Sequence, residues 1–541
     1  MNQLAQSQGI PPPIGGMNSI DALSSMPLTD AVLLNNLFPT QYGLEVRKGS
    51  LEWATMPTSS PVLSLIAFAG IAPKLYACSG SVIYEITSHT PVAVVTGLGS
   101  VEYNFINFAN SAGLWAVAVN GLDDPVVFDS TSTIRRLTLG NGITPYTING
   151  HDPKDFINVM IHARRLWFVE KNSTSAWYLP PDAIYGDVTE YDFGPTWKRG
   201  GTLLILATWT VDSGTGMDDK LVAISNRGEA SLYSGTDPGS LADWNFDGVF
   251  FIGAPLSDRC AVPFGSELVV LTQKGLIPFS QMIVSTELNP RADVVMSNKI
   301  NLLLSDLTNR FSQFFGWTVK ANMEYNELIV NVPGATQADI GPSPGMFSAT
   351  ILPMASEITN TSVQLVMNLT TGAWAAFTNT DAIPFVQWAG SQAFGRNNVV
   401  YRWDFGNQDF VAQNGTGGVP IQFEGIQAFT YAGVMGQLKH VKMAQPWFIT
   451  NNGLNFGIQI EADFKILPFN ATINEVAGIS SLWGTALWGV DLWNNSPNSI
   501  HKPWINCPII GFALAVHIKG NSDGIVTWAS TNLLTEVGGV V

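Results

Sequence analysis

Short apolar segments recur along most of this chain, and each is closed by a turn rich in glycine, asparagine or serine. The segment 74–78 (KLYAC) is followed by Ser79-Gly80 and then by 81–86 (SVIYEI). Two short apolar runs joined by a tight glycine turn are typical of a β-hairpin. We therefore predict a hairpin over 74–86.

The same pattern returns about eight times, at intervals of roughly 35–60 residues. Most copies pair an apolar strand with an aromatic one across a glycine-containing turn, which is typical of β-propeller blades and also of a β-sandwich array. We predict a mainly β fold with propeller-like repeats over 51–420, and the sandwich array is the alternative. The further segments are 113–119 with 125–129, 165–170 with 176–179, 220–225 with 229–233, 267–272 with 276–279, 327–332, 363–368 with 373–377, and 398–403.

One segment inside this series, 297–315, has a helical period instead. Apolar residues lie three or four positions apart at Ile300, Leu303, Leu304, Leu307, Phe311 and Phe314. This spacing predicts an amphipathic helix inserted between the hairpins and packed on the sheets. A helix that binds a partner is the alternative.

The first 50 residues are expected to form an arm and short helices that contact a partner. The stretch PPPIGG at 11–16 cannot hold a helix, so residues 1–16 are predicted to be extended, either disordered or laid on a neighbouring protein. Two short helices are predicted after this arm: 20–25, capped by Ser19, and 29–39, started by Thr29 and Asp30.

The last region, 421–541, is predicted to be an additional β platform with longer strands. It contains a Leu-Trp pair repeated every five residues, at Trp483, Trp488 and Trp493. A period of five fits neither a helix nor a strand, so we predict a loop of tight turns that presents three indoles. These indoles either hold the loop on the core or form a docking surface, because tryptophan often anchors interfaces. The three tryptophans are the candidate interface residues.

Charge is scarce in this chain. Asp, Glu, Lys and Arg make up 13% of the 541 residues, against about 25% in a typical soluble domain. Obligate interfaces are apolar and depleted in charge, so the composition favours a subunit of an assembly and a homo-oligomer. A monomer that faces water with Asn, Ser, Thr and Gly is the alternative.

The net charge of −16 argues against a protein that grips nucleic acid, because such proteins need basic surfaces to neutralise phosphates. An acidic surface past which DNA slides without sticking is compatible with this charge. The N-terminus lacks the pattern of a secretory signal, and no apolar run reaches the ~18 residues of a membrane helix. We expect a protein made in the cytoplasm that does not enter a membrane.

The sequence offers no set of catalytic, cofactor-binding or metal-ligating residues. The six histidines form no HExxH or His/Cys cluster, and neither a nucleophile elbow nor a phosphate-binding loop is present. The adjacent acidic pairs at 123–124 and 218–219 are interpreted as turn and surface residues. Cys78, Cys260 and Cys507 lie far apart and are expected to be buried free thiols. We therefore expect no enzyme activity and no cofactor.

Several segments, in order, resemble one family. The N-terminal stretch PPPIGGMNSIDALSSMPLTDAVLLNNLFPTQYGLEVRKG is similar to the start of tail nozzle proteins of short-tailed bacteriophages, also called tail tubular or packaged-DNA stabilisation proteins. The resemblance covers about residues 11–405. Four further stretches are similar to patterns of that family: LWAVAVNGLDDPVVFD, ARRLWFVEKNSTSAWYLP, ISNRGEASLYSGTDP and VMNLTTGAWAAFTNTDA.

This resemblance implies a structural subunit of the virion tail that is built on a propeller. It implies a hexameric ring below the portal and the adaptor, or head-completion protein, with a lumen that retains packaged DNA and conducts it during ejection. Tail fibres are a further implied partner. A carbohydrate-binding or glycan-cleaving propeller of a tail fibre is the alternative, and a monomeric binding module is a third.

Overall fold

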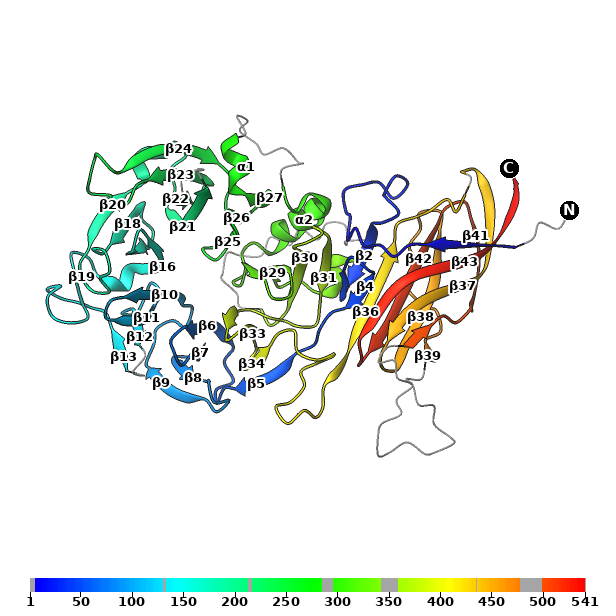
Figure 1. Cartoon of the computed structure of the whole chain (residues 1–541), viewed down its shortest axis with the longest axis horizontal. Coiled ribbons are helices and arrows are strands. Elements are labelled where there is room, and N and C mark those ends of the chain that lie inside the picture. Colours follow the sequence, from blue (N-terminus) through cyan, green and yellow to red (C-terminus); the bar gives the residue numbers. More distant parts are fainter. Residues whose placement is uncertain are drawn as a thin grey trace.

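The computed structural model describes residues 5–129, 133–212, 217–284, 295–341, 359–433, 435–476 and 499–540. The described chain is dominated by antiparallel strands with a few short helices. A β-propeller and a two-sheet β-sandwich lie next to each other along the long axis of the molecule, and both termini lie at the sandwich end (Figure 1). The mainly β fold with a propeller core is confirmed.

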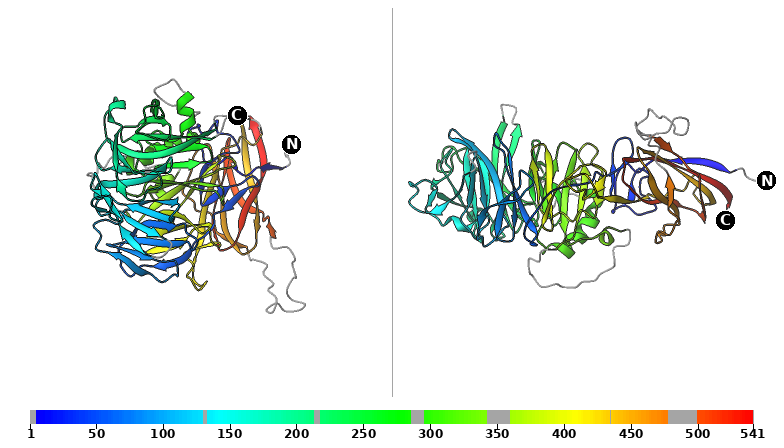
Figure 2. Two further views of the ribbon diagram at one scale, coloured as in Figure 1. Left: turned by 60° about the vertical axis from the view of Figure 1, so that its left-hand side comes forward. Right: turned by 90° about the horizontal axis from the view of Figure 1, so that it is seen from below.

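In the described part of the chain the propeller has seven blades, which we number I–VII, arranged around a central axis (Figures 1 and 2). Six blades are separate small sheets, and blade VI is one end of a larger sheet. Blades I–IV each have four strands, which from the axis outwards are β6 (Val62–Phe68), β7 (Lys74–Ser79), β8 (Val82–Glu85) and β9 (Val92–Thr96) in I; β10 (Asn104–Asn110), β11 (Gly113–Val119), β12 (Val126–Asp129) and β13 (Ile134–Arg136) in II; β16 (Phe156–His162), β17 (Arg165–Glu170), β18 (Ser175–Tyr178) and β20 (Thr189–Asp192) in III; β21 (Leu203–Asp212), β22 (Met217–Ser225), β23 (Glu229–Ser234) and β24 (Asn245–Phe251) in IV.

Blades V–VII complete the ring, and the innermost strand of blade VII lies beside that of blade I. Their strands are β25 (Ala261–Phe264), β26 (Glu267–Thr272) and β27 (Gly275–Pro278) in V, which continues into helix α1 (Phe279–Val284); β28 (Thr318–Asn322), β29 (Glu327–Pro333), β30 (Ser362–Asn368) and β31 (Trp374–Phe377) in VI; β32 (Phe385–Trp388), β33 (Ser391–Arg396), β34 (Val399–Arg402) and β5 (Leu51–Thr55) in VII. A small parallel sheet joins β14 (Thr138–Leu139), β15 (Thr147–Asn149) and β19 (Gly186–Asp187).

The predicted hairpins are mostly the second and third strands of the blades. The hairpin predicted over 74–86, for example, is β7 with β8, and the one over 220–233 is β22 with β23. These strands lie between neighbouring blades and are buried on both faces, so their sequences are nearly continuous apolar runs. Gly228 closes the β22–β23 turn with a φ of +85°, and a Cβ there would lie 2.3 Å from the Gly253 carbonyl carbon.

The sandwich is built from both ends of the chain. One of its sheets, sheet A, has the strand order β3 (Leu37–Pro39), β4 (Leu44–Val46), β43 (Val526–Val540), β37 (Gln437–Thr450) and β40 (Ser499–His501). Strand β1 (Gln6–Ile10) also pairs with β43, and β41 (Ile505–Gly511) also pairs with β37. The other sheet, sheet B, extends blade VI: β31 is followed by β2 (Ala31–Asn35), β36 (Val419–Gln427), β42 (Leu514–Ser522), β38 (Leu454–Ala462) and β39 (Asn474–Val476), and β35 (Gln408–Asp409) pairs with β36.

Sheets A and B enclose an apolar core. The rings of Phe448 on β37 and Phe456 on β38 are 4.7 Å apart and meet edge to face. Trp528 and Leu533 of β43 are buried in the same core. Because sheet B is continuous with blade VI, this core merges with that of blades IV–VI.

The two short helices predicted after the N-terminal arm are wrong, whereas residues 6–10 of the arm are extended as predicted. Segment 29–39 forms β2 and β3 instead of a helix. Strand β2 lies between β31 and β36 and is buried on both faces. Its apolar run AVLLN is compatible with a buried strand as well as with a helix. Segment 20–25 is a series of turns. The Ser19 hydroxyl, which was expected to cap a helix there, accepts a hydrogen bond from the backbone N–H of Leu303, far along the chain. Residues 6–10 pair with β43 of the same chain, and Ile10 is buried there.

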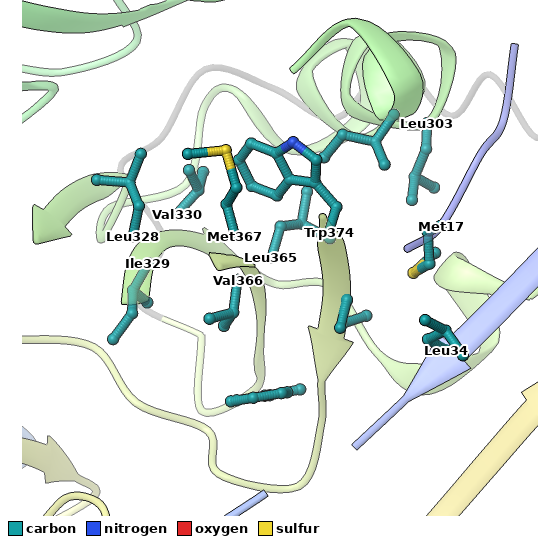
Figure 3. Packing of buried hydrophobic residues seen from close by; sticks show 14 of the residues in the cluster. Met17, Leu34, Leu303, Leu328, Ile329, Val330, Leu365, Val366, Met367 and Trp374 are labelled. Atoms are coloured by element: carbon teal, nitrogen blue, oxygen red, sulfur yellow. The ribbon is translucent and has the colours of Figure 1, made fainter. Parts of the chain in front are cut away.

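The helix predicted over 297–315 is shorter in the structure. A 3-10 turn at Asn298–Ile300 leads into α2 (Asn301–Phe311). Leu303, Leu304 and Leu307 are buried against blade VI, where Leu303 lies close to the Trp374 indole (Figure 3). The Trp374 Nε1 group donates to the Met296 carbonyl at 3.2 Å, so the helix is held at its start on the sheet.

Candidate functional site

The three tryptophans predicted as interface residues, Trp483, Trp488 and Trp493, lie outside the described residues. Three other places in the described chain have features of a functional site. These are the central cavity of the propeller, the solvent-facing side of sheet A, and the seam where the propeller meets the sandwich.

The propeller encloses a central cavity of about 440 Å³ lined by its inner strands. Arg259, just before β25, donates to Asn104 Oδ1 at 3.0 Å, to Ser64 Oγ at 3.1 Å and to the Tyr103 carbonyl at 3.0 Å. The guanidinium group thus ties blades I and II to blade V. Asp258 also lines the cavity and accepts a hydrogen bond from the Asn104 amide.

Lys320 on β28 projects into the same cavity. Its side chain is exposed to the open space of the cavity. The protein atoms that crowd around this space desolvate the ammonium group, and this desolvation, followed by the charge of Arg259, lowers the pKa of Lys320 to about 8. Two basic groups facing one cavity could accommodate a small anionic group.

The solvent-facing side of sheet A, which we call the outer face, carries both apolar and polar side chains. Side chains of β37 alternate, with Val441, Ala444 and Phe448 in the core and the residues between them outside. The outer face also includes residues that pair with β37 on either side. Its members are His440, Lys442, Gln445, Trp447, Ile449, Ile500, Asn506, Pro508, Ile510, Asn532, Leu534 and Glu536.

Large apolar side chains are concentrated at one edge of this face. Ile500 is 62% exposed and Ile510 is 56% exposed, and they pair with Ile449 and His440 of β37. Trp504, between β40 and β41, is 41% exposed. Among the described strands β41 pairs only with β37, and β1 pairs only with β43 at the opposite side, so both lie at edges of sheet A. Exposed apolar groups beside edge strands are typical of interaction surfaces.

The seam between the two bodies contains a buried ion pair. Arg47, in the link from β4 to β5, donates to both carboxylate oxygens of Asp409 at 2.8 and 2.6 Å. Arg47 also donates to Asn36 Oδ1 and to the Thr378 carbonyl. Both side chains of the pair are at most 5% exposed. The pair joins the segments by which the chain passes into and out of blade VII.

Two carboxyl groups lie close to this ion pair. Glu327 begins β29, and Asp404 follows β34. The Asn322 amide nitrogen lies 2.8 Å from Asp404 Oδ2 and 3.4 Å from Glu327 Oε2. Burial raises the pKa of Glu327, and burial together with the neighbouring Glu327 charge raises the pKa of Asp404.

Sheet B contains a second buried charged group. His517 on β42 contacts Glu424 on β36 and Glu461 on β38, each at 2.9 Å, and Lys519 lies 3.1 Å from Glu424. Burial lowers the pKa of His517, but the hydrogen bonds and charges of the two glutamates outweigh it, so the pKa is raised. The pKa values of both glutamates are lowered, since their hydrogen bonds to His517 outweigh the effect of burial.

The remaining candidates from the sequence have structural surroundings. The Asp123 carboxylate accepts from the backbone N–H groups of Gly99 and Ser100, which is a turn role. Cys78 and Cys260 are buried, Cys507 is half-buried, and all three are free thiols. The described ranges contain no group of three or more His, Cys, Asp or Glu side chains placed to hold a metal ion. No described helix is long and apolar enough to cross a membrane.

No family model matches this chain, and no curated protein sequence matches it. Two similar solved structures are the extracellular domain of a hybrid two-component system of B. thetaiotaomicron (12% identity, TM-score 0.39) and virginiamycin B lyase from Staphylococcus aureus (11% identity, TM-score 0.37). The first likeness covers 64% of this chain and 40% of the other, and the second covers 65% and 97%. At this level of similarity, they concern the fold alone.

The sequence pattern missed the seam. Arg47, Glu327, Asp404 and Asp409 come from distant parts of the chain and meet only in the folded protein. One local signal existed: Glu327 and Asp404 each flank an otherwise apolar strand that lies deep in the structure.

Proposed function

We propose that this chain is a structural subunit of a bacteriophage tail nozzle. In this proposal copies of the chain form a ring below the portal and adaptor, and the lumen of the ring retains packaged DNA and conducts it during ejection. The observation that carries the proposal is the outer face of sheet A, where Ile500, Trp504 and Ile510 are exposed beside an edge strand. A surface of this kind favours burial against another subunit.

A closed ring requires two different surfaces on each subunit that fit one another. Sheet A offers two different edges, β1 on one side and β40 with β41 on the other. In such a ring, the β1 edge of one copy would contact the β40–β41 edge of the next copy. A sixfold ring, an adaptor above it and tail fibres beside it are implications of the resemblance in sequence.

The proposed mechanism is mechanical and needs no cofactor. With a net charge of −16, assembled subunits would surround the lumen with predominantly acidic walls. Like charge repels the phosphates, so DNA slides without binding tightly.

The first experiment is to measure the mass of the purified protein in solution and to image any oligomer by negative-stain electron microscopy. We expect rings or tubes with a central hole, alone or after addition of a portal–adaptor complex. A protein that stays monomeric under both conditions would overturn the proposal.

The central cavity favours a second candidate, a propeller that binds or cleaves an acidic glycan. Lys320 faces this cavity and could bind a carboxylate or sulfate group, and the guanidinium group of Arg259 adds positive charge nearby. A screen of acidic and neutral glycans, with Lys320→Ala as the comparison, tests this candidate. Binding that the variant loses would favour it, and the absence of binding to any glycan would remove it.

A further inference from the structure

Three short segments that combine basic residues with glycine meet at one end of blades IV and V. They are 198–201 (KRGG) before β21, 226–228 (NRG) between β22 and β23, and 273–275 (QKG) between β26 and β27. Gly201 lets the first two segments approach closely, because a Cβ there would lie 2.6 Å from Arg227 Cγ. We call this group of segments the basic end of blade IV.

Cations from these segments gather around one aromatic ring. The Arg199 guanidinium lies 3.6 Å from the centre of the Phe251 ring, and Lys274 Nζ lies 4.7 Å from the same centre. Burial, followed by the charge of Arg199, lowers the pKa of Lys274. Lys198, Arg199 and Arg227 are exposed, and none of these three makes an ion pair within the described chain. Like charges held together repel one another, and an anionic partner would relieve this repulsion.

One carboxylate, that of Glu229, lies at the basic end. It is buried, and its two oxygens accept hydrogen bonds from the backbone N–H groups of Lys198 and Arg199 at 3.1 and 2.7 Å. Glu229 therefore holds the segment 198–201 in place and leaves the side chains of the segment free to face solvent. One carboxylate cannot balance the three exposed cations, so positive charge remains at this end.

The opposite end of blade IV is acidic. Strand β22 runs from this acidic end to the basic end, and its first residue, Met217, pairs with Asp212 across the β21–β22 turn. This strand has nine residues, so the two ends of the blade are about 30 Å apart. Four aspartates lie towards the acidic end, on β22, on β24 or in the turn between β23 and β24: Asp219, Asp237, Asp243 and Asp247.

Two of these aspartates are neutralised within the chain. Asp247 and Asp237 each pair with a cation of the same chain, at 2.6 and 3.0 Å. Asp219 and Asp243 instead accept hydrogen bonds from neutral hydroxyl and backbone groups. Negative charge therefore remains at this end of blade IV, as positive charge does at the other.

We propose that the basic end of blade IV docks on the acidic end of blade IV in a second copy of this chain. The two surfaces have opposite charge, and complementary charge favours a contact and fixes its register. The surfaces are unlike, so successive copies can join head to tail. The contact is made by the propellers, so it is separate from the outer face of sheet A and does not depend on the nozzle function.

Cross-linking of the full chain with a carbodiimide tests the proposal, because this reagent joins an amine to a carboxylate that is in contact with it. Lys198 supplies the amine at the basic end, and Asp219 and Asp243 supply carboxylates at the acidic end. These groups are at opposite ends of the blade within one copy, so a peptide in which they are joined, found by mass spectrometry, comes from two copies. Lys220 and Asp247, which are 2.6 Å apart in one copy, are the internal control.

We expect the cross-links between copies to form at low ionic strength. They should fall about tenfold in about 1 M sodium chloride, where charges are screened beyond about 3 Å. The cross-link between Lys220 and Asp247 should persist, because both groups are held by the fold of one copy.

Charge reversal provides a second measurement. Arg227→Glu and Asp219→Lys should each reduce the cross-links between copies by about tenfold. An equal mixture of the two variants should restore them, because each variant keeps the end that the other has lost. Lys465→Glu, at an exposed lysine of the sandwich, is the matched control and should leave the cross-links unchanged. Circular dichroism checks the fold of each variant.

Two results would overturn the proposal directly. One is a wild type that forms the internal cross-link but none between copies at low ionic strength. The other is full cross-linking by both charge-reversed variants. Binding of a short DNA duplex that Arg227→Glu loses, without cross-links between copies, would also overturn it and assign the basic end to nucleic acid.

Discussion

The propeller and the sandwich are assembled from the chain in opposite ways. In blades I–VI each strand pairs with a strand near it in sequence, as in β22 with β23. In sheet A, Gln6 pairs with Thr535 and Leu44 pairs with Trp528, so the two ends of the chain form one sheet. The propeller is thus stabilised largely by local pairings, whereas the sandwich requires both ends of the chain to be in place. We therefore expect the sandwich to unfold more easily than the propeller.

The largest expected effect is at the seam that connects the two bodies. Arg47→Met leaves Asp409 buried without its partner, which costs about 3–5 kcal/mol of unfolding free energy. Urea unfolding followed by tryptophan fluorescence measures the loss, and we expect two separate transitions in place of a shared one. The control is Arg164→Met, at an exposed pair with Asp182, which should cost less than about 1 kcal/mol. A loss of similar size in both variants would contradict the role of the seam.

Matched truncations in the two cores should affect the sandwich and the propeller separately. Leu533→Ala on β43 and Leu166→Ala on β17 each remove a fully buried side chain and should cost about 2–5 kcal/mol. Hydrogen exchange should show that Leu533→Ala raises exchange in sheets A and B, while Leu166→Ala raises it in blades II and III. Equal increases throughout the chain after either substitution would show that the bodies unfold as one unit.

A pH effect confined to the sandwich comes next in size. The pKa of His517 is raised above the 6.5 of the free side chain, so its contribution is complete below about pH 6.5 and is lost as the pH rises through the folded value. The pKa values of Glu424 and Glu461 are lowered, so their contribution is lost as the pH falls below about 4. Breaking charged hydrogen bonds of this kind changes stability by about 1.5–3 kcal/mol.

Melting temperatures between pH 4 and 9 check this dependence. His517→Gln should abolish the loss on the alkaline side, and His440→Gln on the outer face should leave it unchanged. An alkaline loss of the same size in His517→Gln would assign it to other groups.

The smallest effect on stability is expected at the outer face. Ile510→Glu and Leu241→Glu both alter exposed apolar residues, the first on sheet A and the second on the propeller. Each should change the unfolding free energy by about 0.5 kcal/mol or less. Only Ile510→Glu should reduce assembly, because a charge would be buried in the contact. Mass measurement of both variants tests this, and unchanged assembly of Ile510→Glu would exclude this part of the outer face.

The class of fold and most of the propeller hairpins follow from local patterns in the sequence. Strands such as β7 and β22 are buried on both faces and closed by glycine turns, so their pattern is local and strong. The sequence also located helix α2, although not its end at Phe311. The helical spacing of apolar residues continues past Phe311 to Phe314, but the backbone leaves the helix after Phe311 and turns towards β28.

The remaining features depend on contacts between distant segments of the chain. Segment 29–39 has apolar spacing that suits a helix or a buried strand, and the neighbours β31 and β36 select the strand. Strand β5 completes blade VII although its partner β34 lies more than 300 residues later. The carboxyl pair of Glu327 and Asp404 and the Arg47–Asp409 ion pair arise for the same reason. Local patterns reflect burial and turns, whereas contacts between distant segments depend on how whole sheets pack.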